Sequence, residues 1–214
     1  MTITLHKTLF GAAMLAALGT APAHAVVVVN PLNFAAFGDA LVTGMTTAML
    51  STAHSADGET TVSGTDAVFI NDLEAGLQVA SGALGLNAYE GSALFGSFNL
   101  PMPSTVSFNW VLSTVNFAPA LADQAFVVVN GVVQLLGTSA AQAVNGNFSF
   151  NFAAGNHTLS LAVVDVGDFV GKTTLSVSEL SVTAVPEPGT YALWLAGLAV
   201  VGGVARRQRS AAAR

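Results

Sequence analysis

Large apolar and small polar residues alternate in two stretches of the chain. In residues 105–112 and 147–152, almost every second side chain is apolar, and the residues between them are mostly Ser, Thr or Asn. A period of two is typical of a β-strand with one face in a hydrophobic core. The side chains expected to face the core are Val106, Phe108, Trp110, Leu112, Phe148, Phe150 and Phe152.

Turn signals divide the remaining apolar runs into further short strands. Asn130-Gly131 separates Phe126–Val129 from Val132–Leu136. This dipeptide favours a type I′ hairpin because both residues tolerate positive φ. The same reasoning predicts turns at Glu90-Gly91, Asn145-Gly146 and Gly155-Asn156, the first of them joining strands at Leu84–Tyr89 and Ser92–Leu100.

A last strand is expected at Thr173–Ala184. Its apolar positions change parity midway, since Leu175 and Val177 share one parity and Leu180 and Val182 share the other. One extra residue in a strand has this effect. The pattern therefore predicts a β-bulge near Ser178-Glu179.

Turns at intervals of eight to twelve residues predict an all-β fold. We expect an antiparallel β-sandwich, jelly-roll-like, over residues 26–184. The pattern of residues 26–72 predicts individual elements less clearly, and residues 44–63 fit either a strand–loop–strand or a partly helical segment. The chain has no cysteine, so the core must supply the stability, with oxygen-bound calcium as the one expected aid.

The N-terminal end, Met1–Ala25, has the order of parts of a secretory signal peptide. Lys7 supplies the positive start, Leu9–Leu18 the apolar stretch, and Ala23 and Ala25 an A-x-A cleavage site. We therefore expect a signal helix over residues 1–25, export, and a mature chain that begins at residue 26.

The C-terminal end combines a proline motif, an apolar run and a basic cluster. The motif consists of Val185, Pro186, Glu187 and Pro188. Its two prolines fit neither a helix interior nor a central strand. The next seventeen residues, Gly189–Ala205, would form a helix of about 25 Å, which is near the lower limit for a single transmembrane helix. The basic residues expected to act as a cytoplasmic stop are Arg206, Arg207 and Arg209.

Residues 185–209 resemble the PEP-CTERM sorting signal of Gram-negative bacteria, through the literal Pro-Glu-Pro, the spacing and the arginine cluster. The resemblance implies processing by the membrane peptidase exosortase, which is the expected partner. The precursor would be exported through the inner membrane, anchored there transiently by the C-terminal helix, and delivered to the cell surface or the extracellular space. An ordinary single-pass anchor on a proline-containing stalk is the alternative. Residues 210–214 are expected to form a disordered tail.

A second resemblance covers part of the body. Residues 92–136 are similar to a recurring part of PEP-CTERM proteins, with a Ser-Phe-Asn-Trp strand followed by Phe-Val-Val-Val-Asn-Gly. Those bodies look like jelly rolls related to carbohydrate-binding modules. The family resemblance also implies association with exopolysaccharide and with biofilm formation.

The net charge of −6 conceals a strongly acidic body. Five of the six basic residues lie in the two terminal segments, which leaves Lys172 alone in the body. The body contains eleven of the twelve carboxylates, all except Glu187. With one lysine and eleven carboxylates, it has a net charge of −10. Because such a body repels nucleic acid and anionic membrane surfaces, no nucleic-acid partner is expected.

Motifs for catalysis are scarce in the sequence of the body. It has no cysteine nucleophile and no G-x-S-x-G elbow, and neither His54 nor His157 lies in a metal-binding spacing. Asp66 with Asp72 and Glu74, and Asp165 with Asp168, offer paired carboxylates of the kind that act on glycosidic bonds. Their spacing indicates no specific reaction, so we expect them to be solvated residues at loop edges and no catalytic residue to be present.

The best candidate for a metal site is Asp165 with Asp168. These two carboxylates flank Gly167, which allows the loop to bend around a hard cation. Calcium is therefore the one cofactor that the sequence suggests.

The leading hypothesis is a non-enzymatic exported protein of the cell surface or extracellular matrix, sorted by exosortase and associated with exopolysaccharide or biofilm. The alternative is a carbohydrate-binding module, assisted by calcium. Trp110 and Tyr89 are the only Trp and Tyr of the body, and Trp110 is expected in the core, which argues against a strong lectin. A secreted hydrolase is the third and least supported hypothesis.

Overall fold

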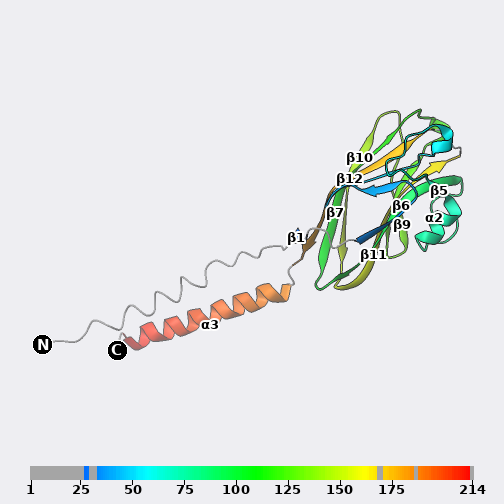
Figure 1. Cartoon of the computed structure of the whole chain (residues 1–214). Helices are drawn as coiled ribbons and strands as arrows, with labels where there is room; N and C mark the ends of the chain where they lie inside the picture. The colour runs from blue at the N-terminus through cyan, green and yellow to red at the C-terminus, as the bar shows by residue number, and fades with distance from the viewer. Residues whose placement is uncertain (1–26, 29–32, 168–170, 186–187, 213–214) are drawn as a thin grey trace. The chain divides into compact units, whose positions relative to one another are not determined.

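The computed structural model of the chain describes residues 27–28, 33–167, 171–185 and 188–212. The chain divides into a body, Val27–Val185, and a second unit of which only helix α3 (Pro188–Ala212) falls among the described residues. Figure 1 shows the strands of the body and the α3 helix.

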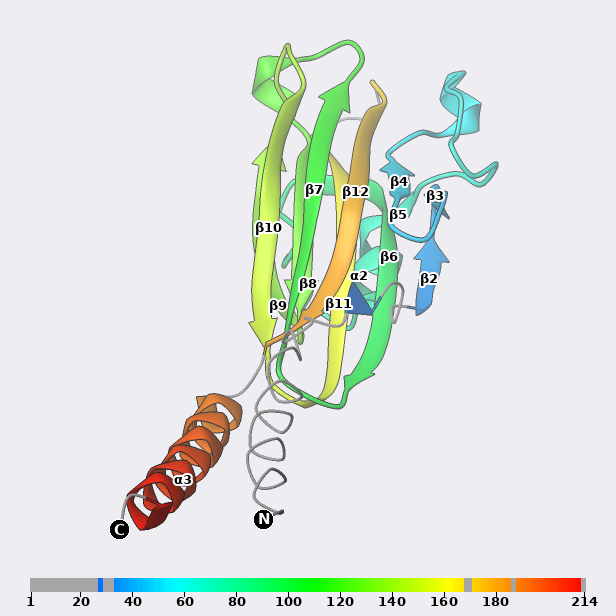
Figure 2. The same ribbon diagram turned by 90° about the vertical axis from the view of Figure 1, so that its left-hand side faces the viewer.

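The body consists of β-strands in two sheets, which Figure 2 shows as two layers. The first sheet has the strand order β10 (Val144–Phe152), β7 (Ser104–Thr114), β12 (Thr173–Ala184), β4 (Ala48–Ser51) and β3 (Ala40–Val42), with β1 (Val27–Val28) also pairing with β12. The second has the order β2 (Asn33–Phe37), β6 (Ala88–Leu100), β11 (Gly155–Val166), β8 (Gln124–Val129) and β9 (Val132–Thr138), with β5 (Val68–Phe69) also pairing with β6. All of these pairings are antiparallel, so the predicted all-β sandwich is confirmed.

Between the two sheets lies the main hydrophobic core. The alternating residues of β7 face into it as predicted, and they meet Leu159, Leu161 and Val163 of β11. Phe148 of β10 stacks on Phe108 with ring centroids 4.9 Å apart. The period of two in the sequence therefore identified the buried face of both strands correctly.

Trp110 occupies a slot beside two glycines, in β9 and β10. A Cβ added to Gly137 or Gly146 would lie 2.8 or 2.7 Å from a carbon of the indole ring. Trp110 is only 6% exposed, so its predicted place in the core is confirmed. The glycines are needed here because any larger residue would displace the ring.

A second apolar cluster covers the outer face of the second sheet. Helix α2 (Ile70–Gly76) and the residues after it supply Leu73, Leu77 and Leu84. These pack on sheet residues Ala93, Phe126, Ala162 and Val164. The sequence pattern did not predict α2, because seven residues are too few for a helical period to show.

One predicted turn and the predicted bulge are confirmed by backbone geometry. Asn130 and Gly131 join β8 to β9 with φ of 49° and 79°, as a type I′ turn requires. The predicted bulge in β12 appears as a register shift between Ser178 and Ser181, and Glu179 has a φ of 55°. The turn predicted at Gly155-Asn156 is wrong in position, because both residues belong to β11 and residues 153–154 connect it to β10.

The turns predicted at Glu90-Gly91 and Asn145-Gly146 are wrong, because both pairs lie inside continuous strands. Each glycine allows a neighbouring group to lie closer to the backbone than a side chain would permit. A Cβ on Gly91 would come within 2.3 Å of the Val163 carbonyl oxygen, and Gly146 lies against the Trp110 indole. A glycine in a strand interior often marks such a contact.

Helix α3 begins at Pro188, the last proline of the sorting motif, where proline is favoured because its φ suits the first helical turn. The predicted transmembrane helix is not confirmed, since none of the described helices is both long and apolar enough to cross a membrane. Helix α3 extends to Ala212 and so includes residues 210–212 of the predicted disordered tail, where Ala211 and Ala212 have a high helix propensity. The predicted signal helix at residues 1–25 lies outside the described residues.

Candidate functional site

Asp39, which directly precedes β3, forms hydrogen bonds to the loop of residues 52–66. These bonds and the polar contacts within the loop are called the loop network. Asp39 is fully buried and accepts hydrogen bonds from the backbone N–H groups of Val62 (2.8 Å) and Ser63 (2.7 Å). The hydroxyls of Ser51 and Ser63 also donate to it. A buried carboxylate with this many donors is a structural anchor, here fastening the loop to the sheet.

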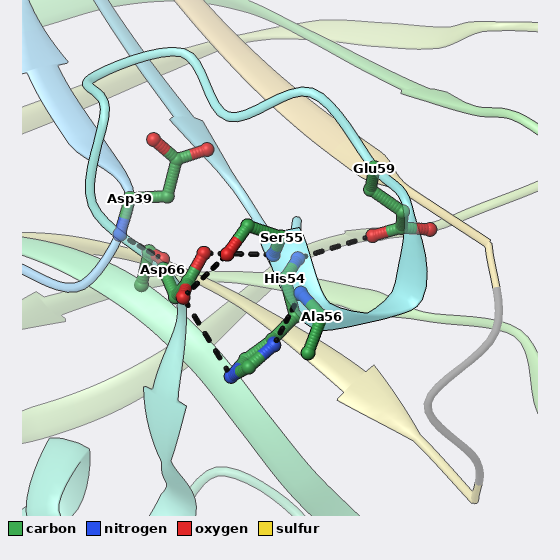
Figure 3. A network of polar contacts seen from close by, with 7 residues as sticks. Asp39, His54, Ser55, Ala56, Glu59 and Asp66 are labelled. Carbon is green, nitrogen blue, oxygen red and sulfur yellow. Dashed lines mark hydrogen bonds and ion pairs between the residues drawn. The ribbon is translucent and has the colours of Figure 1, made fainter.

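A second carboxylate in this network, Asp66, lies between Ser55 and the ring of His54 (Figure 3). Ser55 donates its backbone N–H to Asp66 at 2.7 Å and its hydroxyl at 2.9 Å. His54 Nε2 lies 3.9 Å from the carboxylate. The backbone hydrogen bond, then the hydroxyl and the nearby His54, hold the pKa of Asp66 below its ordinary value.

The imidazole of His54 has a local structural use. Its Nδ1 accepts a hydrogen bond from the backbone N–H of Ala56 at 3.3 Å and so caps the short helix η1 (Ser55–Asp57). Its backbone N–H donates to Glu59 at 3.2 Å. Figure 3 shows these contacts within one loop, which they hold in shape.

Glu90 is a buried carboxylate in β6, within electrostatic reach of the same loop. It is 3% exposed, and burial raises its pKa above the ordinary value. The nearby His54 opposes that rise, while the acidic Asp57, Glu59 and Asp66 add to it. This residue escaped the sequence analysis because it was assigned to a turn.

Three of the carboxylates considered for acid–base chemistry have separate local settings. Asp66 binds Ser55, and Asp72 is exposed on α2. Glu74 is buried and accepts hydrogen bonds from the backbone N–H groups of Gly82 (2.9 Å) and Leu84 (3.0 Å). Glu74 is therefore an anchor for the residues after α2, a role that no local spacing indicates.

Of the two residues suggested for calcium, Asp165 is buried near the end of β11, opposite Glu90 in register. Gly167 has a positive φ of 89°, as the predicted bend requires. Asp168 lies outside the described residues. Within the described ranges, no three His, Asp or Glu side chains gather closely enough to hold a metal ion.

A surface hollow with a volume of about 770 Å³ is lined mainly by β6, β11 and the β8–β9 turn, next to the end of α2. None of the described residues that line it is an Asp, Glu, Lys or Arg. The polar lining residues are Gln78, Ser97, Asn99, Asn130, Asn156, His157 and Thr158, and the apolar ones are Leu77, Phe95 and Phe98. Sequence analysis missed this hollow because its residues come from four separate segments.

A smaller hollow of about 400 Å³ lies on the first sheet, at the bulge of β12. Its amide groups already bond within the protein. Asn109 Nδ2 donates to Glu179 at 2.7 Å, and Asn147 Nδ2 donates to Asn109 Oδ1 at 2.9 Å. This hollow therefore offers fewer open hydrogen-bonding groups to a ligand.

At the C-terminal end, a family model described as the PEP-CTERM protein-sorting motif matches residues 184–210. The match includes the expected motif residues 185–188 and the basic residues Arg206, Arg207 and Arg209. None of the curated proteins compared with the chain matches it.

Several solved structures have a weak similarity to the chain. One is a family 35 carbohydrate-binding module from an environmental isolate, 20% identical over 49% of this chain and 77% of that one, with a TM-score of 0.30. Another is TmCBM61 in complex with beta-1,4-galactotriose, 11% identical over 73% and 90%, with a TM-score of 0.34. A third is a family 35 module from Clostridium thermocellum, 16% identical over 43% and 72%, with a TM-score of 0.23. At these scores the likenesses add nothing to the two-sheet architecture that the strand pairings establish directly.

Proposed function

Starting from the PEP-CTERM sorting motif that this chain carries, we propose an exported protein of the cell surface or extracellular matrix, processed by exosortase and associated with exopolysaccharide in a biofilm. The observation that carries the proposal is the match at residues 184–210. The motif itself marks an exported protein that exosortase sorts. The destination, the transient anchoring of the precursor at the inner membrane and the association with polysaccharide are the proposed parts.

A non-enzymatic role is supported by the way the carboxylates of the body are used. Asp39, Asp66 and Glu74 each accept hydrogen bonds from backbone N–H groups and hold a neighbouring loop in place. Carboxylates that bind substrate or exchange protons need open oxygens instead. The net charge of −10 fits a body that anionic membranes repel.

The sorting proposal is tested by replacing Pro186, Glu187 and Pro188 with alanine in the full chain. Exosortase should then fail to process the protein, so that uncleaved precursor accumulates in the membrane fraction on immunoblots. Replacing the exposed Pro101 with alanine is the control, since this proline lies in the body, and processing should be normal. Normal processing of the triple variant would refute the proposal.

Carbohydrate binding, assisted by calcium, is the second candidate function. It is favoured by the surface hollow lined by amide and hydroxyl groups, because such groups recognise the hydroxyls of sugars. Isothermal titration of the chain with matrix polysaccharide, with and without a chelator, tests it. If the chelator reduces the heat of binding, calcium assistance is supported. If no binding occurs with or without the chelator, the carbohydrate-binding function is contradicted.

A further inference from the structure

The hollow beside the end of α2 has the features of a built binding site. Its floor includes Asn99 and Asn156, which lie directly opposite each other in register on β6 and β11. Ser97 and Thr158 form the next polar pair in the same register. The two pairs are two residues apart along each strand, about 7 Å, and neighbouring strands are about 5 Å apart. The result is a small rectangular array of hydrogen-bonding groups.

The amides of this array keep most of their hydrogen-bonding capacity. Asn99 Nδ2 donates to Asn156 Oδ1 at 2.7 Å. An asparagine amide offers two donor hydrogens and two acceptor lone pairs, so this bond leaves donors and acceptors on both residues for a ligand. Both side chains are exposed. By contrast, the amides of the smaller hollow bond to Glu179 and to each other.

The rim of the hollow is held rigidly. Asn130 accepts a hydrogen bond from the Thr158 N–H at 3.0 Å through its side chain and donates its own N–H to the Thr158 carbonyl at 3.0 Å. His157 packs edge-on against Phe152, with ring centroids 5.0 Å apart, and contacts Asn130. A site ordered before binding loses less conformational entropy when the ligand arrives.

Gln78 occupies a backbone position at which glycine would be less strained. It follows α2 with a φ of 57°, in the left-handed region where glycine usually ends a helix. A residue with a Cβ is strained in that conformation. Its exposed side chain lines the hollow. Backbone strain of this kind is commonly found where a side chain is needed for function.

The charge of the site limits the class of ligand. Among the residues that the structure describes, no Asp, Glu, Lys or Arg lines the hollow, although the body carries a net charge of −10. A cation would find no carboxylate there, and an anionic polymer would be repelled by the body. Half-buried Phe95 supplies an apolar surface beside the polar array. An uncharged ligand with many hydroxyls and some apolar C–H surface meets all of these conditions.

We propose that the hollow formed by Gln78, Phe95, Asn99 and Asn156 binds a short uncharged oligosaccharide. The proposal rests on the carbohydrate-binding function suggested above and specifies where that function resides. The polar array makes hydrogen bonds to the sugar hydroxyls, Phe95 contacts the apolar face of a ring, and Gln78 closes the site from the side of α2.

The test is calorimetric titration of the full-length chain with galactotriose, mannotriose and cellotriose as neutral probes, and with trigalacturonate as an anionic one. We expect at least one neutral probe to bind and trigalacturonate to bind at least about tenfold more weakly. Combining Asn99→Ala with Asn156→Ala should weaken binding by at least about tenfold, because several hydrogen bonds are lost. The matched control combines Asn109→Ala with Asn147→Ala in the other hollow, and it should bind as the unsubstituted chain does.

Gln78→Gly separates binding from folding. Glycine relieves the left-handed strain, so the urea midpoint should stay the same or rise, while affinity falls about threefold or more. Unchanged affinity in this variant and in the Asn99/Asn156 variant would overturn the assigned site, even if carbohydrate binding itself persisted. Equal binding of trigalacturonate would overturn the uncharged ligand class. Failure of all neutral probes would overturn both the site and the carbohydrate-binding candidate, whereas the sorting proposal depends only on processing of the precursor.

Discussion

At the scale of single residues, the body depends on carboxylates whose partners are distant in sequence. Asp39 binds residues 62 and 63, and Glu74 binds residues 82 and 84. Sequence periodicity identified apolar core residues such as Trp110 because a strand places alternate side chains on one face. It contains no signal for a buried acid, since the donors that satisfy it are brought together only by the loop conformation.

Asp39→Ala is expected to destabilise the body strongly. The substitution leaves the backbone N–H groups of Val62 and Ser63 without their acceptor, and hydrogen bonds to a charged group contribute about 1.5–3 kcal/mol each. A loss of about 3 kcal/mol or more in the free energy of unfolding should appear in urea denaturation. Asp57→Ala, at an exposed position, is the control and should change stability little. A stability change below about 1 kcal/mol for Asp39→Ala would contradict the anchoring role.

Glu90 predicts a specific dependence of stability on pH. Its pKa in the folded body is raised by burial, so the ionised form disfavours folding. The contribution of Glu90 to the free energy of unfolding is fully present below the ordinary pKa of 4.5. It is lost as the pH rises through the raised pKa of the folded body. Glu90→Gln, which cannot ionise, should therefore raise the urea midpoint at pH 7.5 and leave it nearly unchanged at pH 4. A lower midpoint for the variant at pH 7.5 would show that the ionised carboxylate is stabilising instead.

At the scale of secondary-structure elements, the same dipeptide has two outcomes. Asn130-Gly131 forms the predicted hairpin turn, whereas Asn145-Gly146 lies within β10. The difference is tertiary, because Gly146 makes room for the Trp110 indole. The long strands β7 and β12 were predictable from alternation alone. The sequence prediction divided β6 in two because it assigned Gly91 to a turn. In the structure, the missing side chain of Gly91 allows the backbone of Val163 to pack closely against β6.

Gly91→Ala tests that explanation. The added Cβ would lie 2.3 Å from the Val163 carbonyl oxygen and 3.1 Å from a methyl carbon of Leu73. Since the first contact is with backbone, β6 and β11 must separate locally, at a cost of about 1–3 kcal/mol or more. Thermal unfolding should show a clearly lower Tm. Gly203→Ala in α3 is a matched control, because its added Cβ meets nothing within 4 Å, and an unchanged Tm for Gly91→Ala would refute the close approach.

At the scale of the whole molecule, charge is divided sharply along the chain. The body has a single lysine, while four of the six basic residues lie at positions 206–214. The sorting motif was predictable in full because it is a short linear sequence, and it matches at residues 184–210. The hollow on the second sheet was not, since α2, two strands and a turn must assemble before its residues meet.

This division of charge leads to a prediction about the precursor. If Arg206, Arg207 and Arg209 keep the C-terminal end in the cytoplasm, replacing all three with glutamine removes the positive charge that sets its orientation. More unprocessed protein should then appear outside the membrane fraction, and the yield of processed protein should fall, because the motif no longer reaches the peptidase in the correct orientation. Arg214→Gln lies beyond the matched residues and should fractionate normally. If the triple variant fractionates and is processed like the unsubstituted chain, the arginines have no role in retention, and sorting depends on the proline motif and the apolar run alone.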